Sequence, residues 1–279
     1  MSKDKKKVGF PIMEEMTVKT VREYLTKNNS IILPIGIIEQ HGYHLPLITD
    51  ALMAREVGRL VAEKMNILMA PVFYTSFSGG SLPGTINISP SVTALVISDI
   101  LISLASQGFK KIYIFLGHGG GENLKVIDIS VKLLLKSNPI FSDVMVSMFP
   151  VWSFDESGKG WKQAVKDQDW HAGWLETSMM LAVAPHLVRM EEMERDTDAV
   201  RKMQLKGWYA EKIVDEDVVI PRTISHPKVK VGVIGNPKKA SEKLGKEVVN
   251  EAVRLIIDKI KKLEKKYDGK YKKVELKQT

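Results

Sequence analysis

The sequence predicts an α/β fold in which a parallel sheet carries helices on both faces. Short apolar segments of strand length alternate with longer segments of helical periodicity, and glycine or proline residues mark many of the turns. This alternation is typical of β–α–β units, whose strands run parallel because each helix returns the chain to the same edge of the sheet. Ligands of such sheets bind beyond the carboxyl ends of the strands, so polar residues there are candidates for a functional site.

Four segments are predicted to form the strands of this sheet. The apolar run at residues 31–35 has no alternating polar positions, as expected of a strand that is buried on both faces. The others are residues 67–72, 111–116 and 143–149. Residues 229–234 are predicted as a further strand near the end of the chain.

Helices are predicted between these strands, and several have recognisable ends. Asn66 is placed to end the first of them. Ser89 and Pro90 are predicted to open the next, since serine is a common cap and proline fits the first helical turn. Asn236 and Pro237 are predicted to cap a long final helix. The earlier predicted helices cover residues 50–65, 90–107, 122–136 and 172–184.

The chain is expected to form one domain over residues 1–279. Its 279 residues are ample for a core, and no internal repeat, low-complexity tract or flexible linker divides them. The lysine-rich ends, at about residues 1–8 and 266–279, are expected to be flexible. No apolar run reaches the roughly 20 residues that span a bilayer, and no apolar signal core follows the basic start, so a cytoplasmic protein is expected.

Two features of the composition limit the chemistry. The chain has no cysteine, so any metal must bind oxygen and nitrogen ligands, as zinc, manganese and iron(II) do. The net charge is +8, and much of it lies at the two ends. Solvated ends explain this charge. The alternative is nucleic-acid binding, but the basic ends carry no recognition motif and few aromatic residues.

The densest group of metal-binding side chains follows the first predicted strand. Glu39 and His41 are two positions apart, so in an extended segment their side chains point the same way and reach one metal or two adjacent metals. Asp50, at the start of the next helix, adds a carboxylate that can bridge two ions. These three residues predict a metal centre. His44 is expected to support a ligand or face the substrate rather than bind metal.

A glycine-rich turn after residues 111–116 contains His118. The turn lacks the lysine and hydroxyl of a nucleotide phosphate loop, and it is not a dinucleotide-binding motif. Glycines beside a single histidine, such as Gly119, allow the backbone to approach a metal or substrate closely. Glu122 begins the next predicted helix, where it is either a further metal ligand or an acid that stabilises the helix N-terminus.

A third group of polar residues lies at the start of the helix predicted at residues 172–184. His171 and Glu176 are five positions apart, and both could face the N-terminal end of that helix, towards the site. The alternative is structural, with a histidine that begins a helix and a glutamate on its surface. Trp170 and Trp174 lie in the same segment, and they suit stacking on a flat or sugar ring.

Taken in order, these motifs resemble those of the creatininase (creatinine amidohydrolase) family. The first has the pattern Gly-x-x-Glu-x-His-Gly-x-His-Leu-Pro-x-x-Thr-Asp and covers residues 36–50. The later ones are Pro-Gly-Thr at 83–85, Gly-His-Gly-Gly at 117–120, His-Ala-Gly-x-x-Glu-Thr-Ser at 171–178 and Gly-Val-Ile-Gly-Asn-Pro at 232–237. The lysine-rich ends lie outside the resemblance.

The resemblance implies a three-layer α/β/α sandwich with a mostly parallel central sheet. It also implies a site for two divalent metal ions, which would be zinc, manganese or iron. Glu39 and His118 would bind one ion, His41 the other, and Asp50 would bridge them. Glu122 is a further candidate ligand, although the glycine turn has one residue more than the usual family spacing.

The resemblance also implies roles in catalysis and substrate binding. His171 would carry protons near the scissile bond, and Glu176 would orient His171 or the reacting water. Ser76 falls where relatives contact the substrate. The remaining expected substrate-binding residues are Gly119, Trp170 and Trp174. In many relatives a glutamate occupies the place of Trp174, and a Glu-His pair occupies that of Ser78 and Gly79.

The expected function is that of a metal-dependent hydrolase that opens a small cyclic substrate by attack of a metal-bound hydroxide. The substrate would be a cyclic amide or a cyclic ketone such as a keto-inositol. The alternatives are a deformylase or peptidase on the same dinuclear site, or a catalytically silent metal-binding protein. The expected partners are the small-molecule substrate and further copies of the chain in a homo-oligomer. Neither a membrane nor a nucleic acid is expected as a partner.

Overall fold

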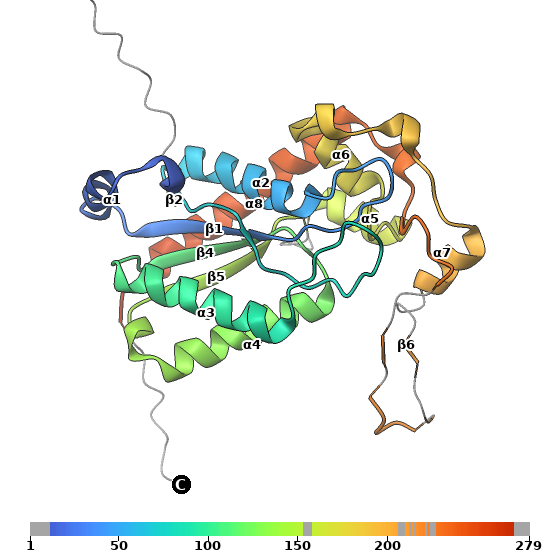
Figure 1. Ribbon diagram of the computed structural model, residues 1–279. Coiled ribbons are helices and arrows are strands. Elements are labelled where there is room, and N and C mark those ends of the chain that lie inside the picture. Colours follow the sequence, from blue (N-terminus) through green and yellow to red (C-terminus); the bar gives the residue numbers. More distant parts are fainter. Residues whose placement is uncertain are drawn as a thin grey trace, which may run out of the picture.

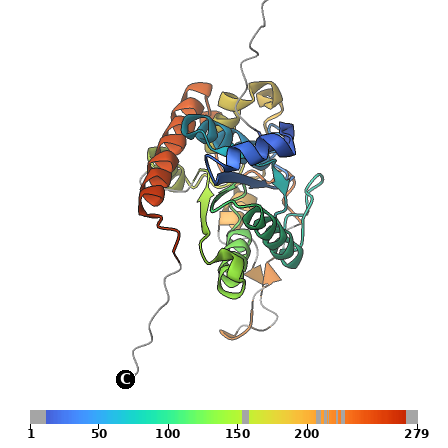
Figure 2. The same ribbon diagram turned by 90° about the vertical axis from the view of Figure 1, so that its left-hand side faces the viewer.

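The structure, a computed structural model, describes residues 12–152, 158–205, 210–211, 214, 216–220, 222–223 and 227–270. A central sheet lies between two layers of helices (Figure 1), which confirms the predicted three-layer α/β/α sandwich. The view turned by 90° shows α8 (Glu242–Lys266) and α3 (Pro90–Ser106) on opposite sides of the strands (Figure 2).

Five short strands form the sheet, and all their pairings are parallel. Their bounds are Ser30–Gly36 for β1, Leu68–Met69 for β2, Phe73–Tyr74 for β3, Lys111–Leu116 for β4 and Met145–Pro150 for β5. The strand order is β2-β1-β4-β5, and β3 pairs with β1 as well. The carboxyl ends of β1, β4 and β5 therefore meet at one edge of the sheet.

The strand predicted at residues 67–72 is interrupted in the structure. Two short strands replace it, and both pair with β1: Leu68 lies opposite Ile31, and Phe73 lies opposite Ile35. Pro71 lies between them and has no N–H to donate, so the ladder of hydrogen bonds cannot continue through it. The prediction of one continuous strand was wrong for this reason.

The two helical layers bury alternate residues of the same strands. On one face Ile32 packs in a cluster with α2 (Thr49–Met65), α6 (Trp174–Val183) and α8. On the other face Ile31 and its alternate neighbours pack with α3 and α4 (Gly121–Ser137). Because both faces are covered, the central strands are apolar without alternation, as the sequence predicted.

The remaining elements lie around this body. The helices are α1 (Val18–Leu25), α5 (Lys159–Asp167) and α7 (Asp198–Leu205), and the antiparallel strands β6 and β7 span Ala210–Glu211 and Arg222–Thr223. Short 3₁₀ turns cover Met13–Glu15, Pro139–Phe141, Pro185–Leu187, Met190–Glu192 and Pro237–Lys239.

Two predicted helix ends are confirmed and one is wrong. Asn66 ends α2 in the left-handed conformation, with φ of 53°, and Pro90 is the first residue of α3. The final helix, however, does not begin at Asn236 and Pro237, which belong to the 3₁₀ turn. Ser241 caps α8 instead, because its side chain accepts a hydrogen bond from the Leu244 N–H at 3.2 Å.

Residues 229–234 do not form the predicted strand. The carboxylate of Asp196 accepts hydrogen bonds from the main-chain N–H groups of Lys230, Val231 and Gly232 at 2.7–3.2 Å. Gly232 has a φ of +77°, which an extended strand does not allow. Only Ile234 pairs across, in an isolated antiparallel bridge to His171. The segment therefore serves as a support for His171.

The predicted flexible ends lie largely outside the described residues. This applies to residues 1–8 and 271–279, whereas α8 continues to Lys266. Among the helices that the structure describes, none combines the length and apolar character needed to cross a bilayer.

Candidate metal centre

The predicted metal-binding side chains meet at the carboxyl edge of the sheet. Glu39 and His41 follow β1, Asp50 lies in the first turn of α2, and His118 follows β4. His41 and Asp50 are 0% and 2% exposed, and Glu39 and His118 are also buried. The fold therefore brings His118, which is 68 positions from Asp50 in the sequence, to the local cluster of Glu39, His41 and Asp50.

One group of ligand atoms comprises Glu39, Asp50 and His118. Nδ1 of His118 lies 2.9 Å from Oδ2 of Asp50 and 3.0 Å from Oε2 of Glu39. One ligand atom from each residue lies within 4.8 Å of the other two, which is close enough for a single ion to touch all three.

A second group comprises His41, Asp50 and Glu176. Nε2 of His41 lies 3.2 Å from Oδ1 of Asp50 and 3.7 Å from Oε2 of Glu176. These ligand atoms also lie within 4.8 Å of one another. The two oxygens of Asp50 thus face different groups, which is the arrangement of a carboxylate that bridges two ions. The position of Glu176 makes it a candidate ligand, in addition to the orienting role expected from the sequence.

The donor set fits divalent cations. Oε2 of Glu39 and Nε2 of His41 are buried, and neither makes a hydrogen bond with any residue of the described ranges. Both atoms nevertheless lie close to a group of opposite charge, in contacts that lack hydrogen-bond geometry. A cation would satisfy these atoms, and imidazole with carboxylate oxygen suits zinc, manganese or iron(II).

The charges in this cluster depend strongly on one another. Burial alone would lower the pKa of His41, but the carboxylates of Asp50 and Glu176 raise that pKa to about 10. Burial likewise opposes protonation of His118, yet Glu39 and Asp50 raise its pKa well above the ordinary range. Burial raises the pKa of Glu176 to about 7. In the absence of a metal, protons on His41 and His118 therefore balance the negative charge of the carboxylates, as bound cations would.

A main-chain contact fixes the spacing between two of the ligand-bearing segments. Gly117 precedes His118, and a Cβ at this glycine would overlap the carbonyl oxygen of Asp50. Only glycine lets the end of β4 approach the first turn of α2 this closely.

His171 lies on the wall of the site, next to the second group. Its ring centroid is 4.4 Å from that of His41. Nε2 of His171 lies 2.8 Å from the main-chain carbonyl oxygen of Gln40 and 3.0 Å from the side-chain Nε2 of Gln40. Burial and the charge of His41 lower the pKa of His171, so its ring is neutral at neutral pH.

The start of α6 is built to hold His171 and Glu176 in place. The carboxylate of Asp169 accepts hydrogen bonds from the N–H groups of Trp174, Leu175 and Asn236 at 2.9–3.0 Å. Oε2 of Glu176 accepts the N–H of Ala172 at 2.6 Å. Ala172 has a φ of +50°, so the helix begins at Trp174 rather than at residue 172 as predicted.

A cavity of about 580 Å³ opens above the metal-binding residues. Glu39, Asp50, His118, His171 and Glu176 all contribute to its lining. Its walls also contain Phe77, Ser78, the glycines at 79–80 and 119–121, Trp152, Trp161 and Trp170. A pocket of this size holds a small organic molecule. The candidate metal ligands and His171 thus line one cavity.

Comparison with known proteins agrees with this geometry. A sequence model of the family described as Creatininase: Creatinine amidohydrolase matches residues 14–260. The chain belongs to the creatininase family. Because this family consists of metal-dependent hydrolases, the protein is an enzyme of that class.

Relatives with two different activities are similar to this creatininase-family chain. Creatinine amidohydrolase of Pseudomonas putida is 28% identical over 58% of this chain and 67% of its own. The mycofactocin precursor peptide peptidase of Mycolicibacterium smegmatis is 27% identical over 94% of this chain and 96% of its own. A crystal structure of creatininase has a TM-score of 0.74 at 24% identity, over 93% of this chain and 99% of that chain, and it supports the fold.

Three residues that the sequence predicted at or near the site belong neither to the lining of the cavity nor to the groups of candidate metal ligands. Trp174 is buried in the core, and its Nε1 donates to Asp167 at 3.1 Å. Ser76 is buried behind the lining, while its neighbours Phe77 and Ser78 form part of the wall. His44 is buried, and its Nε2 lies 2.9 Å from Thr177 Oγ1 in a hydrogen bond.

Glu122 is exposed and stands outside all the groups of close ligand atoms in the described part of the chain. It lines the cavity from the first turn of α4, just after the glycines at 119–121. The three glycines between His118 and Glu122 separate its carboxylate from the candidate metal ligands along the chain. Gly119 and Trp170 do line the cavity, as expected.

Sequence reasoning missed Gln40, Asp169, Trp152 and Trp161. The two tryptophans belong to the tryptophan-rich segment at residues 151–174, which was the only local signal for them. Gln40 lies between two predicted ligands, but its contact with His171 joins residues 131 positions apart. Asp169 accepts hydrogen bonds from main-chain N–H groups. Every residue except proline has such a group, so the sequence does not reveal which ones Asp169 binds.

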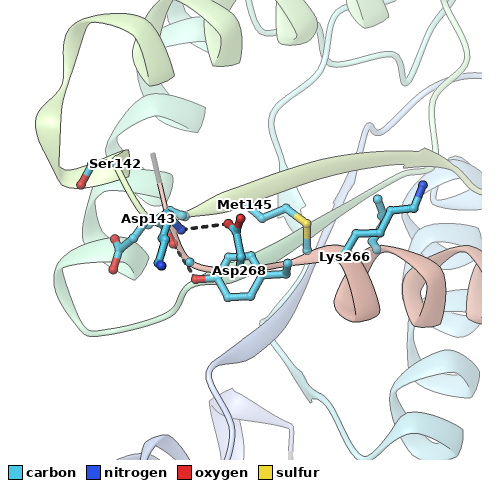
Figure 3. Close-up of a pocket in the computed structure, with 10 residues that line it drawn as sticks. Ser142, Asp143, Met145, Lys266 and Asp268 are labelled. Carbon is cyan, nitrogen blue, oxygen red and sulfur yellow. Dashed lines mark hydrogen bonds between the residues drawn. The ribbon is translucent and has the colours of Figure 1, made fainter. Parts of the chain in front are cut away.

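A second cavity, of about 250 Å³, lies between the start of β5 and the end of α8 (Figure 3). Asp143, Met145, Lys266 and Asp268 are among its lining residues, and the hydroxyl of Tyr267 donates to the Asp143 carbonyl oxygen at 2.6 Å. No histidine lines it, and no described group of metal-ligating atoms lies there. Within the described ranges, the groups of candidate metal ligands thus lie at the first cavity and not at the second.

Proposed function

We propose that this creatininase-family hydrolase uses two divalent metal ions to open a small cyclic amide. The observation that carries the proposal is the pair of ligand groups that share Asp50, below a cavity with His171 on its wall. Glu39 and His118 would hold one ion, and His41 and Glu176 the other. Zinc, manganese and iron(II) all suit these oxygen and nitrogen ligands.

Cations bound there would lower the pKa of a coordinated water and polarise the substrate carbonyl. The protein supplies the remaining steps. Gln40 engages Nε2 of His171, which leaves Nδ1 as the ring nitrogen available to a ligand in the cavity. In this proposal His171 takes at Nδ1 the proton that the attacking water loses, and passes it to the amide nitrogen as the C–N bond breaks. Proton transfer of this kind contributes about 10²–10⁴-fold to a rate.

A peptidase on the same centre is the second candidate. The peptidase relative matches this chain over nearly its whole length, whereas the creatinine amidohydrolase matches over 58% of it. The cavity of about 580 Å³ also has room for more than a five-membered ring. A deformylase, or a hydrolase that opens a cyclic ketone, would use the same residues with a different leaving group.

The test is a hydrolysis assay on the full chain after loading with manganese, zinc or iron(II). The panel contains lactams such as creatinine and hydantoin, a keto-inositol, formamides and short peptides, and metal content is measured in parallel. We expect about two ions per chain and ring opening of at least one cyclic amide. Hydrolysis of peptides alone would favour the second candidate. Absence of metal binding, or of turnover on the whole panel, would overturn the proposal.

A further inference from the structure

The wall of the large cavity carries carboxylates and indole rings but no lysine or arginine among the described residues. Three of its carboxylates, on Glu39, Asp50 and Glu176, belong to the metal-ligand groups. A fourth, on Asp169, is occupied by three main-chain N–H groups. The fifth belongs to Glu122, which is therefore the acid left for a ligand.

Glu122 is well placed for that role. It is exposed, lines the cavity, and has no ion-pair partner in the described ranges. The first turn of a helix also favours a negative charge at this position. The three preceding glycines, at 119–121, put no side chain between this carboxylate and the cavity.

Indole faces lie beside the same opening. Trp170 is 45% exposed although it lines the cavity, and Trp161 meets it edge to face at a centroid distance of 6.0 Å. The ring of Trp152 lies against the glycine turn, since a Cβ at Gly119 would be 2.7 Å from its Cζ2. An exposed indole face attracts cations through its quadrupole, and a nearby carboxylate adds to this attraction.

We propose that the outer part of this cavity, formed by Glu122, Trp152, Trp161 and Trp170, binds a positively charged group of the substrate. The inference deepens the proposed function and rests on it for the position of the scissile carbonyl, which faces the metal ligands. The substrate is then an amide with an ammonium or guanidinium group at its far end. An amide with a carboxylate at that end meets the charge of Glu122 and binds weakly.

Three probes of one scaffold test this inference: the primary amides of N-acetyl-lysine, N-acetyl-norleucine and N-acetyl-glutamate. Binding to the metal-loaded full chain is measured by calorimetry and tryptophan fluorescence. We expect the lysine probe to bind about ten-fold more tightly than the norleucine probe, and the glutamate probe to bind most weakly. About 0.5 M salt shortens the screening length to about 4 Å and should reduce the preference.

A matched pair of variants assigns the effect to Glu122. Glu122→Gln should reduce the ratio of lysine-probe to norleucine-probe affinity to near one. Asp128→Asn removes an acid from the same helix but outside the lining, and should leave the ratio unchanged. Equal binding of all probes, no binding of any, or a preference that survives in Glu122→Gln would overturn the inference. Binding is read without turnover, so failure to hydrolyse any amide tests the proposed function separately.

Discussion

Gln40 presents two groups of opposite hydrogen-bonding character to one ring nitrogen of His171. Its main-chain carbonyl oxygen lies 2.8 Å from Nε2 of His171, and its side-chain amide nitrogen lies 3.0 Å from the same atom. When Nε2 carries a hydrogen it donates to the carbonyl, and when it does not it accepts from the amide. The ring is thus anchored in either tautomer, while Nδ1 is left for the substrate.

Gln40→Met should reduce kcat by about ten-fold with little change in KM or metal content. The variant keeps the side-chain volume and the main-chain carbonyl but loses the amide, whose Oε1 accepts the Gly42 N–H at 3.1 Å and whose Nε2 lies 3.0 Å from Nε2 of His171. Steady-state kinetics on the substrate identified from the panel, with metal analysis, provide the measurement. Gln40→Glu, which keeps an acceptor but has no amide donor, should not restore the rate. An unchanged kcat in Gln40→Met would show that the amide has no role in turnover.

Asp50→Ala should lose both metal ions and all activity, since one carboxylate serves both ligand groups. Metal content by atomic absorption and the hydrolysis assay measure the two effects. Asp258→Ala, an exposed change on α8, is the matched control and should retain both ions. Retention of two ions in Asp50→Ala would contradict the shared-ligand arrangement.

His171→Ala should keep its metals and lose turnover by about 10²–10⁴-fold, because the ligand groups around Asp50 do not include it. The measurements are metal stoichiometry and single-turnover rates. Full activity in this variant would exclude the proton-transfer role, and loss of metal would make His171 a ligand through the third group that it forms with Glu39 and His41.

Metal affinity should rise with pH. The pKa of Glu176 is about 7 because of burial, and Asp50 and Glu176 raise that of His41 to about 10 against the effect of burial. Both groups must lose protons to bind a cation, so binding releases protons and weakens as pH falls below these values. Calorimetry at about pH 6 and about pH 8, in buffers of different ionisation enthalpy, measures the affinity and the protons released. An affinity independent of pH would contradict the assignment of these ligands.

Asp169→Ala should lower the free energy of unfolding by about 2–4 kcal/mol, because three main-chain N–H groups would lose their acceptor in a buried site. Chemical denaturation of the metal-free protein measures this change. Asp258→Ala, exposed on α8, should stay within about 0.5 kcal/mol of the parent. An equal, small effect in both variants would show that Asp169 does not hold the start of α6.

The sequence sufficed for the parallel central sheet and the main helices, and for the clustering of candidate metal ligands after β1, because these depend on local patterns. The apolar run of β1 and the polar cluster that follows it lie within about twenty residues. The parallel topology then places the ends of β1 and β4 at the same edge, which predicted one shared site, whereas the pairing of Glu39 with His118 on one ion came from the resemblance to the family.

The errors arose where long-range contacts decide the outcome. Trp174 faces the core rather than the cavity because α6 packs against α8, and Trp161 of α5 lines the wall near Trp170 instead. Asp196 binds the N–H groups that a strand at residues 229–234 would need. The pattern of apolar residues within α6 does not reveal its packing against α8, and the pattern within residues 229–234 does not reveal their contact with Asp196.

The contact between Gly117 and the carbonyl oxygen of Asp50 has a consequence for ion selection. Because the two main chains approach this closely, the polypeptide rather than the ion sets the distance between the backbones that carry Asp50 and His118. A centre with a fixed span discriminates among cations by ionic radius, since it cannot contract around a smaller one. Gly117→Ala would separate the two segments, and its effect would be a changed order of metal preference as well as weaker binding.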